Sequence, residues 1–337
     1  MLEVVFFRIL PTLTSASSTG GADHRGRCRT FRNAAVAVIS GYNEGMLSNH
    51  KFGDTGLNVS ILGLGAGQIG MTDVAETAAS DVLNGALDLG VTLIDTAASY
   101  GLSEERIGRH LGHRRDEFVL STKGGQAIDG YPDWSAGSLS ASIEQSLRRT
   151  RSERIDVYFL HSCPVEVLRR GDLQDTLDQA VAAGKIRIAG YSGDNEHLAF
   201  AVDSGRFAAI ETSINIADQW NLRNVVGHGT DLGVIAKRPI ANAPWRFAER
   251  PIGNYAELYW QRLRELHLDP RDLDWAEFAL RFSAYAPGVH SAIVGTAKLA
   301  NLRRNVEAAN HGPLPPTMLA DIDQAWQRAG SDWPSST

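Results

Sequence analysis

Short apolar runs alternate with amphipathic segments along the chain from about residue 51 to residue 329. Apolar runs bounded by Gly, Asp or Ser are typical of buried strands, whereas apolar positions three and four residues apart are typical of helices that cover a core. We expect a first strand in VSILGLG (59–65) and further strands at 91–94, 117–122, 155–160, 186–190, 208–212, 233–236 and 290–294. The expected helices are 76–89, 103–111, 138–150, 172–183, 195–204, 218–230, 273–284, 298–309 and 316–329.

The order of these segments predicts the architecture. Eight consecutive strand–helix units without a break in composition are typical of an α/β fold of the (β/α)8 TIM-barrel type, formed by a single domain over residues 46–337. The turn Asp54-Thr55-Gly56 predicts a short N-terminal hairpin, and the helix at 316–329 is an extra C-terminal helix. Segment 238–272, rich in Trp, Tyr and Arg, is expected to be an irregular loop that faces the substrate.

Residues 1–45 differ from the rest of the chain. They carry arginines among clustered Ser, Thr and Gly, without a steady periodicity. The apolar stretch VVFFRIL is interrupted by Arg8 and lacks a small-residue cleavage site, so it matches a signal peptide poorly. We interpret 1–45 as a disordered or non-native extension, with Met46 as an alternative start.

Composition narrows the class of protein. Of 337 residues, 43% are hydrophobic and 21% are charged, which is ordinary for a globular protein with a substantial core. The net charge of −6 argues against nucleic acid or an anionic membrane surface as the main partner. No apolar run approaches the roughly 18 residues that cross a bilayer. The two cysteines, Cys28 and Cys163, imply no disulfide framework, so we expect a cytoplasmic protein. The sequence does not predict its oligomeric state.

A glycine motif follows the first expected strand. Gly65-Ala66-Gly67-Gln68-Ile69-Gly70 matches G-x-G-x-x-G, and Asp95 closes the next strand, as in a doubly wound dinucleotide-binding domain. However, the next helix starts late, Asp95 lies 25 positions past Gly70, and the remaining chain forms no second domain. We therefore expect these glycines to let the first strand–helix loop pass close over the active site.

Residues with acid–base chemistry follow three successive strands. Asp95 and Tyr100 follow the second strand, Lys123 the third and His161 the fourth, so a barrel would bring them to its C-terminal face. A lysine within about 4–6 Å favours the phenolate and lowers the tyrosine pKa, ordinarily near 10. The aspartate would keep that lysine charged and in place, and the histidine would orient a carbonyl oxygen. Alone, each residue has an ordinary explanation as a cap, a packed ring or a core histidine. Together they predict a general acid at a carbonyl that accepts hydride from a nicotinamide.

Three segments carry a resemblance to a family. GVTLIDTAASYGLSEERIG (90–108), STKGG (121–125) and LHS (160–162) closely resemble the aldo-keto reductases, and the resemblance extends over about residues 51–329. It implies a (β/α)8 barrel that binds NADPH or NADH in an extended pose at its top, without a Rossmann domain. It also implies that Tyr100 is the proton donor, that Lys123 and Asp95 tune it, and that His161 positions the substrate.

The resemblance further implies a set of cofactor contacts. Ser192 and Asn215 match family positions at the carboxamide, although the Asn that commonly follows the serine is absent, and Glu211 stands where the family usually has Gln. A carboxylate accepts from the carboxamide NH2 but cannot donate to its oxygen. The phosphate end is expected at Gly295, Thr296, Lys298 and Asn305, around a helix N-terminus.

The choice between NADP and NAD depends on one position in that segment. The frequent arginine of the family for the 2′-phosphate falls on Asn301, so Lys298, Arg303 or Arg238 would have to replace it. Arg303 and its neighbour Arg304 fit a solvated helix face equally well. The choice stays open, and family frequency favours NADP.

Aromatic residues are expected in or near the top-face loops. Tyr131, Trp134, Trp220 and Trp245 would suit a sugar ring or an aromatic aldehyde, or would simply cap the barrel. No His-x-His or paired metal-ligand pattern occurs at the strand ends, which argues against a metal-dependent hydrolase. We predict an NAD(P)-dependent oxidoreductase that acts on a small carbonyl, alcohol or sugar substrate. The alternatives are an NAD-linked aldose or hydroxymethyl dehydrogenase running oxidatively and a non-catalytic NADPH-binding regulatory subunit.

Overall fold

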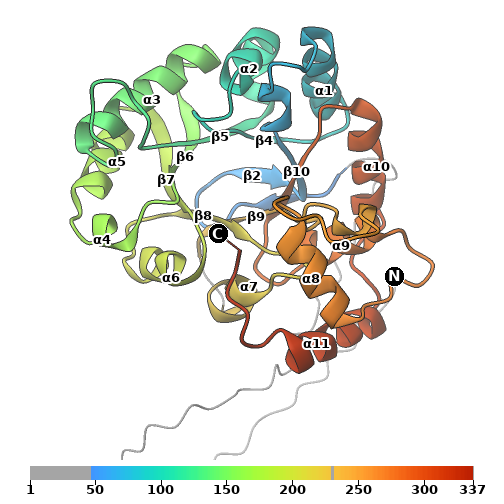
Figure 1. Ribbon diagram of the computed structural model, residues 1–337. Coiled ribbons are helices and arrows are strands. Elements are labelled where there is room, and N and C mark those ends of the chain that lie inside the picture. Colours follow the sequence, from blue (N-terminus) through green and yellow to red (C-terminus); the bar gives the residue numbers. More distant parts are fainter. Residues whose placement is uncertain (1–46, 229–230, 337) are drawn as a thin grey trace, which may run out of the picture. The chain divides into compact units, whose positions relative to one another are not determined.

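Eight parallel strands close into a barrel in the computed structural model, which describes residues 47–228 and 231–336. In chain order they are β3 (Leu62–Gly65), β4 (Leu93–Asp95), β5 (Val119–Gly124), β6 (Ile155–His161), β7 (Ile186–Ser192), β8 (Ala209–Ser213), β9 (Gly233–Lys237) and β10 (Ser291–Gly295). Each strand pairs with its neighbour in sequence, and β10 pairs with β3 to close the ring (Figure 1). The predicted (β/α)8 barrel is confirmed.

Helices form the outer layer and bury their apolar faces against the outward-facing strand residues. The longer ones are α1 (Glu76–Asp88), α2 (Ser103–Leu111), α3 (Ala136–Thr150), α5 (Asp172–Ala182), α6 (Asn195–Asp203), α8 (Glu257–Leu266), α9 (Trp275–Ala284), α10 (Leu299–Asn310) and α11 (Pro316–Ala329). The short helical segments are η1 (Gln68–Gly70), η2 (Gly112–Glu117), α4 (Val165–Leu168), α7 (Trp220–Asn224), η3 (Val226–His228) and η4 (Pro244–Arg246). Across the described ranges 47–228 and 231–336, no helix combines the length and apolar character needed to cross a membrane.

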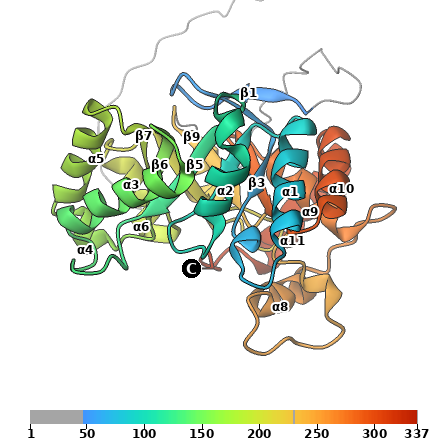
Figure 2. The same cartoon turned by 90° about the horizontal axis from the view of Figure 1, so that it is seen from above.

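The predicted N-terminal hairpin is present and lies at the end of the barrel opposite α8 (Figure 2). It consists of β1 (Asn49–Lys51) and β2 (Asn58–Ser60), which pair antiparallel. Phe52, at its turn, is fully buried and belongs to the apolar cluster inside the barrel. A side chain on Gly233, at the start of β9, would overlap the Phe52 ring. The hairpin therefore closes the bottom of the barrel.

Alternation along the strands divides the barrel interior into two levels, because every second side chain points inward. On β5, Val119 belongs to the interior apolar cluster, and Lys123 lies four residues further up on the same side. On β6, Phe159 precedes His161 in the same way. The lower interior is thus apolar, and polar side chains occur where the strands end at the top.

Two expectations about the later part of the chain were wrong. Over the described residues 218–228, the expected helix is reduced to α7 and η3. The tight turn of Asn215 and Asp218, with reciprocal backbone hydrogen bonds of 3.0 Å, delays its start, and the non-helical Val225 ends α7. Asn221 then turns its amide back onto the Asp194 carboxylate at 2.8 Å. Segment 238–272 was expected to be irregular, but it contains α8, whose buried positions include Tyr259 and Leu266. The expected extension at 1–45 lies outside the described residues.

Candidate active site

The four predicted catalytic side chains converge at the top of β4, β5 and β6. Lys123 Nζ donates to both carboxylate oxygens of Asp95, at 2.8 and 2.6 Å, and to the backbone oxygen of Thr96 at 2.9 Å. Lys123 Nζ also lies 5.5 Å from the centre of the Tyr100 ring. The rings of Tyr100 and His161 meet edge to face, with centroids 5.9 Å apart. The structure therefore brings together all four residues that the sequence placed at the strand ends.

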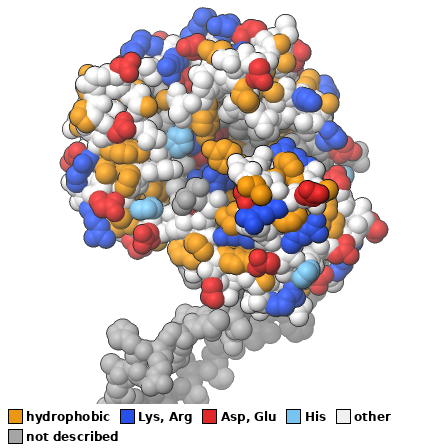
Figure 3. All heavy atoms as spheres, in the orientation of Figure 1, with side chains coloured by type: hydrophobic (Ala, Val, Ile, Leu, Met, Phe, Trp, Pro, Cys, Tyr) orange, Lys and Arg blue, Asp and Glu red, His pale blue; other side chains and the backbone are white. Residues whose placement is uncertain are grey.

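The four residues divide into a buried pair and an accessible pair. Asp95 and Lys123 are each 1% exposed, and Ser121 donates a further hydrogen bond of 2.7 Å to Asp95 Oδ1. Tyr100 and His161 are only partly buried and remain reachable from the mouth. This mouth opens on the face shown in Figure 3, which is hollowed near its centre. A reactant would therefore meet the phenol and the imidazole first.

A second carboxylate reaches the lysine from the other side of the barrel. Glu211, on β8 and 2% exposed, places Oε2 3.1 Å from Lys123 Nζ. Its other oxygen, Oε1, accepts from Ser192 Oγ at 3.4 Å. The side chain expected at the cofactor carboxamide is thus also an ion-pair partner of Lys123.

The charges of this cluster shift the pKa values of its members. Burial, and then the carboxylate of Glu211, raises the pKa of Asp95 to about 7 in spite of Lys123. Lys123 is also buried, but its two carboxylate neighbours raise its pKa above the ordinary value, so it stays charged. Burial, and then the charge of Lys123, lowers the pKa of His161 to about 4. His161 is therefore neutral at neutral pH and retains one ring N–H with which to donate a hydrogen bond.

The direction of the Tyr100 shift corrects the prediction from the sequence. Lys123 is the largest influence and lowers the pKa of Tyr100, as expected. Burial and the carboxylates of Glu211 and Asp95 together raise it by more, so the pKa of Tyr100 lies above its ordinary value. The prediction was wrong because it counted the charge of Lys123 but not the burial of the phenol, nor the carboxylate of Glu211.

The glycine motif has the packing role that the sequence analysis gave it. A side chain on Gly70 would overlap the backbone oxygen of Tyr100, and Gly70 O accepts from Leu102 N at 2.9 Å. A Cβ on Gly67 would lie 3.4 Å from the Tyr100 ring. The loop between β3 and α1 therefore holds the segment that carries Tyr100.

Buried polar atoms near the cluster lack partners among the residues that the structure describes. Asn215 is fully buried, and its Nδ2 has no hydrogen-bond partner in that set, while its Oδ1 accepts from Ala217 N at 2.9 Å. Glu211 Oε2 has the ion pair with Lys123 but no aligned hydrogen bond within the same set. A free amide donor beside a carboxylate acceptor is complementary to a primary carboxamide, which offers one C=O and one NH2.

The residues expected at the phosphate end line a separate hollow of about 590 Å³. Gly295, Thr296, Asn301 and Asn305 are among its lining residues. Lys298 is exposed at the start of α10 and donates its backbone N–H to Thr296 Oγ1 at 3.1 Å. The lining also contains Asp274, Glu277, Arg304, Glu307 and His311.

The structure separates the arginines that were considered for this end. Arg304 lines the hollow and donates to Asn301 Oδ1 at 2.6 Å. Arg303 instead lines a different surface depression, beside Asp81 and Asp88 on α1. Arg238, after β9, donates to the backbone oxygen of Ser336 at 2.8 Å.

The segment after α11 returns across the strand ends, as Figure 1 shows, and reaches Arg238. Ser335 exchanges two hydrogen bonds with the Asn195 side chain, at 2.6 and 2.9 Å, and is 5% exposed. Ser336 N donates to Asp218 Oδ2 at 2.9 Å, and Arg262 donates to Pro334 O at 2.6 Å. The C-terminal residues therefore form part of the rim of the mouth, which the sequence analysis did not foresee.

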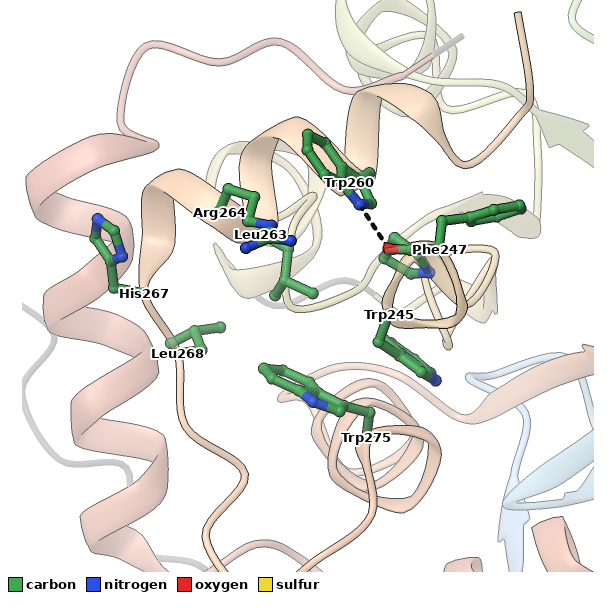
Figure 4. Close-up of a pocket in the computed structure, with 9 residues that line it drawn as sticks. Trp245, Phe247, Trp260, Leu263, Arg264, His267, Leu268 and Trp275 are labelled. Atoms are coloured by element: carbon green, nitrogen blue, oxygen red, sulfur yellow. Dashed lines mark hydrogen bonds between the residues drawn. The ribbon is translucent and has the colours of Figure 1, made fainter. Parts of the chain in front are cut away.

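The predicted substrate aromatics lie in different places. Trp245 stacks on Trp275 with centroids 5.8 Å apart, in a pocket of about 320 Å³ whose other lining residues come from η4, from α8 and from the residues directly after them (Figure 4). None of the four catalytic candidates lines that pocket. Trp134 lies against Gly125 at the end of β5, whereas Tyr131 is 49% exposed. Trp220, at the start of α7, packs on the main core.

The sequence also matches a known family over most of its length. The sequence model of the Aldo/keto reductase family matches residues 61–327. The chain belongs to the aldo/keto reductase family. The family shows that the chain is an oxidoreductase, and nicotinamide cofactors are typical of aldo/keto reductases.

Individual relatives agree with this membership. The oxidoreductase YqkF of Bacillus subtilis is 27% identical over 292 residues, which cover 78% of this chain and 92% of the relative. The D-threo-aldose 1-dehydrogenase of a Pseudomonas species is 28% identical over 80% of this chain and 95% of its own. Among solved structures, the holo form of aldo-keto reductase AKR11C1 from Bacillus halodurans is 25% identical, covers 83% of this chain and 96% of that chain, and has a TM-score of 0.71.

Some residues of this aldo/keto reductase site were not singled out from the sequence. Ser121 and Thr96 hold the Asp95–Lys123 pair, and their position beside the strand exits was a usable signal. For Arg304 the sequence left a solvated face of α10 as an open alternative, and the structure shows that this exposed residue lines the hollow. Asn195 and Asp218 contact the C-terminal segment, and no sequence pattern indicated this pairing.

Proposed function

We propose that this chain transfers hydride between a nicotinamide cofactor, NADP or NAD, and a small carbonyl or alcohol substrate. The observation that supports this proposal most is the buried Asp95–Lys123 pair beneath two accessible groups, Tyr100 and His161. The arrangement supplies a proton donor and a neutral hydrogen-bond donor at one mouth. When bound, the dihydronicotinamide supplies the hydride for the carbonyl carbon.

The protein residues have separate tasks in this reaction. Tyr100 gives its phenolic proton to the carbonyl oxygen as the oxygen gains charge. His161, neutral because its pKa is lowered to about 4, donates a hydrogen bond that orients the same oxygen. Lys123, fixed by Asp95, stabilises the phenolate that remains. Solvent at the mouth then returns a proton to Tyr100.

The residues of the site fit a nicotinamide cofactor. The unpartnered Nδ2 of Asn215 would donate to the carboxamide oxygen, and Glu211, with Ser192 beside it, would accept from the carboxamide nitrogen. The hollow at Gly295 and Thr296 would take the phosphate end, with Arg304 in its lining. NADP remains the first cofactor to test on this basis, with NAD as the alternative.

A sugar or another small polyol aldehyde is the substrate class we propose. Two curated relatives are named D-threo-aldose 1-dehydrogenase and L-glyceraldehyde 3-phosphate reductase, the latter from Escherichia coli and 27% identical over 83% of this chain. Both names refer to reactions of aldoses or short aldehydes, which supports this substrate class. Oxidation of an aldose or hydroxymethyl group is the same reaction in reverse, with the Tyr100 phenolate as base.

Steady-state turnover on a panel of short aldehydes and aldoses tests the proposal. Tyr100→Phe should lower turnover by at least about 100-fold, the usual scale for loss of a general acid. Tyr255→Phe removes the same hydroxyl from a residue that is 86% exposed and should leave turnover unchanged. Fluorescence titration with NADPH and NADH shows which cofactor binds. Binding without turnover on any substrate would contradict the catalytic proposal and favour a cofactor-binding regulatory subunit.

A further inference from the structure

Two carboxylates share one ammonium group inside this barrel. Lys123 Nζ is 2.6 Å from Asp95 Oδ2 and 3.1 Å from Glu211 Oε2. All three residues are at most 2% exposed. When all three are ionised, the trio carries a net charge of −1 in a region that excludes water. An Asp–Lys pair alone would be neutral. The trio therefore opposes a negative charge on a fourth, neighbouring side chain more strongly than such a pair would.

Tyr100 is that fourth neighbour. Its ring centre lies 5.5 Å from Lys123 Nζ, yet among the described side chains no hydrogen bond joins the ammonium to the phenol. The three donors of the ammonium are directed to Asp95 and the Thr96 carbonyl instead. Glu211 Oε2 adds a second negative charge 3.1 Å from the same ammonium, without an aligned hydrogen bond to it among the described residues.

We propose that Glu211 is a positioning residue that holds part of the charge of Lys123 away from Tyr100, so that Tyr100 remains a phenol over a wider pH range and the resting site is kept in the form that reduces carbonyls. The inference that the site favours reduction rests on the proposed function, whereas the effect of Glu211 on the ionisation of Tyr100 does not. The raised pKa of Tyr100, to which Glu211 contributes, agrees with this geometry.

The proton and electron balance follows from this assignment. In reduction, the carbonyl carbon gains a hydride with two electrons from the dihydronicotinamide, and the carbonyl oxygen gains the proton of Tyr100. The products are the alcohol, the oxidised nicotinamide and the Tyr100 phenolate, which takes a proton from solvent. Oxidation needs the phenolate at the outset. Glu211 makes this form scarcer at neutral pH, and therefore favours reduction there.

Other charged groups also face Tyr100 and bear on its ionisation. Lys123 and Arg238 favour the phenolate, whereas Asp95 and Glu211 oppose it. His161 faces the ring but is neutral above about pH 4. Lys237, on β9, acts on His161 and is paired with Asp194 at 3.1 Å. Of the two carboxylates, Glu211 can be neutralised, as Glu211→Gln, without breaking the two-point pair of Asp95 with Lys123.

Ultraviolet titration of tyrosinate in the cofactor-free protein tests the assignment directly. The titration curve of Tyr100 is obtained by subtracting the curve of Tyr100→Phe from that of the wild type. For the Glu211→Gln protein, it is obtained by subtracting the curve of the double variant with Tyr100→Phe from that of Glu211→Gln. We expect Tyr100 to ionise about one pH unit lower, or more, when Glu211 is neutral, which is at least about a tenfold change in its ionisation constant. The buried Tyr158, Tyr191 and Tyr259, whose pKa values are raised by burial, cancel in each difference.

Glu104→Gln is the matched control. Glu104 is also a buried glutamate, 1% exposed, and accepts from Thr122 Oγ1 at 2.7 Å. Thr122 precedes Lys123 on β5, so its side chain points to the helices while Lys123 points inward. Removing the charge of Glu104 should leave the Tyr100 titration where it is in the wild type.

The outcomes separate this inference from the proposed function. Difference curves that coincide over the whole accessible pH range, or an equal shift in Glu104→Gln, overturn the role of Glu211 even if the enzyme turns over. A shift confined to Glu211→Gln supports that role even if no substrate is found. Where turnover is found, the pH profile of kcat/KM for oxidation should rise about one pH unit earlier in Glu211→Gln. If the pH profile of kcat/KM for oxidation is the same in Glu211→Gln as in the wild type, the inference that Glu211 favours reduction is overturned.

Discussion

Lys123 and Asp95 form a two-point ion pair, with Nζ 2.6 and 2.8 Å from the two carboxylate oxygens, and both side chains are 1% exposed. Burying two charges is favourable only if each is fully compensated. Here the Thr96 carbonyl and Glu211 compensate Lys123, and Ser121 donates to Asp95, although burial and the Glu211 carboxylate still raise the pKa of Asp95 to about 7. Each charge of the pair depends on the other, so removing one member affects the fold as well as the proposed chemistry.

Lys123→Met should be strongly destabilising. It leaves the carboxylates of Asp95 and Glu211 buried without their shared cation, so we expect the free energy of unfolding to fall by about 3–5 kcal/mol. Denaturant unfolding of the wild type and the variant at neutral pH measures this. The control is Lys185→Met, which breaks an ion pair with Glu144 between side chains about half exposed and should cost less than about 1 kcal/mol. Similar losses in both variants would contradict the account.

His161 should make the protein less stable in acid. Its folded-state pKa is lowered from 6.5 to about 4, so between these values the unfolded chain binds a proton that the folded protein does not. Stability from this residue is present above about pH 6.5 and is lost as the pH falls towards 4, by up to about 3 kcal/mol. Unfolding of His161→Asn from about pH 7 to pH 4 should lack this loss. The exposed His113→Asn should retain it, and a His161→Asn curve that parallels the wild type would refute the prediction.

Gly70→Ala should impair catalysis more than stability. The new methyl group would overlap the Tyr100 carbonyl and push the segment that carries the phenol. We expect a drop in turnover of about 100-fold or more, because misplacing a catalytic group by about 1 Å has effects of that size. Gly112→Ala has open space around its Cβ and serves as control. Unchanged turnover in Gly70→Ala would show that this contact does not position Tyr100.

Deleting residues 333–337 should destabilise the rim of the mouth. Asp218 would lose the Ser336 N–H, and Arg262 would lose the Pro334 carbonyl and the Trp333 ring, 5.1 Å from its guanidinium carbon. Leaving these buried groups unpartnered should cost about 1–3 kcal/mol in the free energy of unfolding. Asp332→Ala, an exposed change in the same segment, is the comparison, and a truncated protein as stable as that variant would count against the prediction.

The sequence was sufficient to predict the barrel and the convergence of the four candidate residues, because both depend on local signals. Apolar runs mark the strands, and Asp95, Lys123 and His161 each follow one directly. Contacts across the barrel depend on something else. The approach of Glu211 on β8 to Lys123 on β5 follows from barrel closure and from side-chain direction, neither of which appears in a linear pattern. The direction of the Tyr100 pKa shift was predicted wrongly because it depends on the burial of the phenol and on this contact across the barrel.

The later part of the chain was harder to predict. Helix α8 buries Arg262 on the same face as Tyr259 and Leu266 and leaves Leu258 exposed, so its apolar periodicity was masked and the segment was interpreted as a loop. The contact of Ser335 with Asn195 joins residues 140 positions apart through backbone groups of the tail. Such a contact has no residue-type signature, and only the three-dimensional path of the chain reveals it.

Phe52 closes the bottom of the barrel, and this closure has a kinetic consequence. Cofactor and substrate must then both enter through the mouth at the top. The one that binds deeper must bind first and dissociate last. Product-inhibition patterns should therefore reveal a compulsory sequence of arrival and departure rather than a random one.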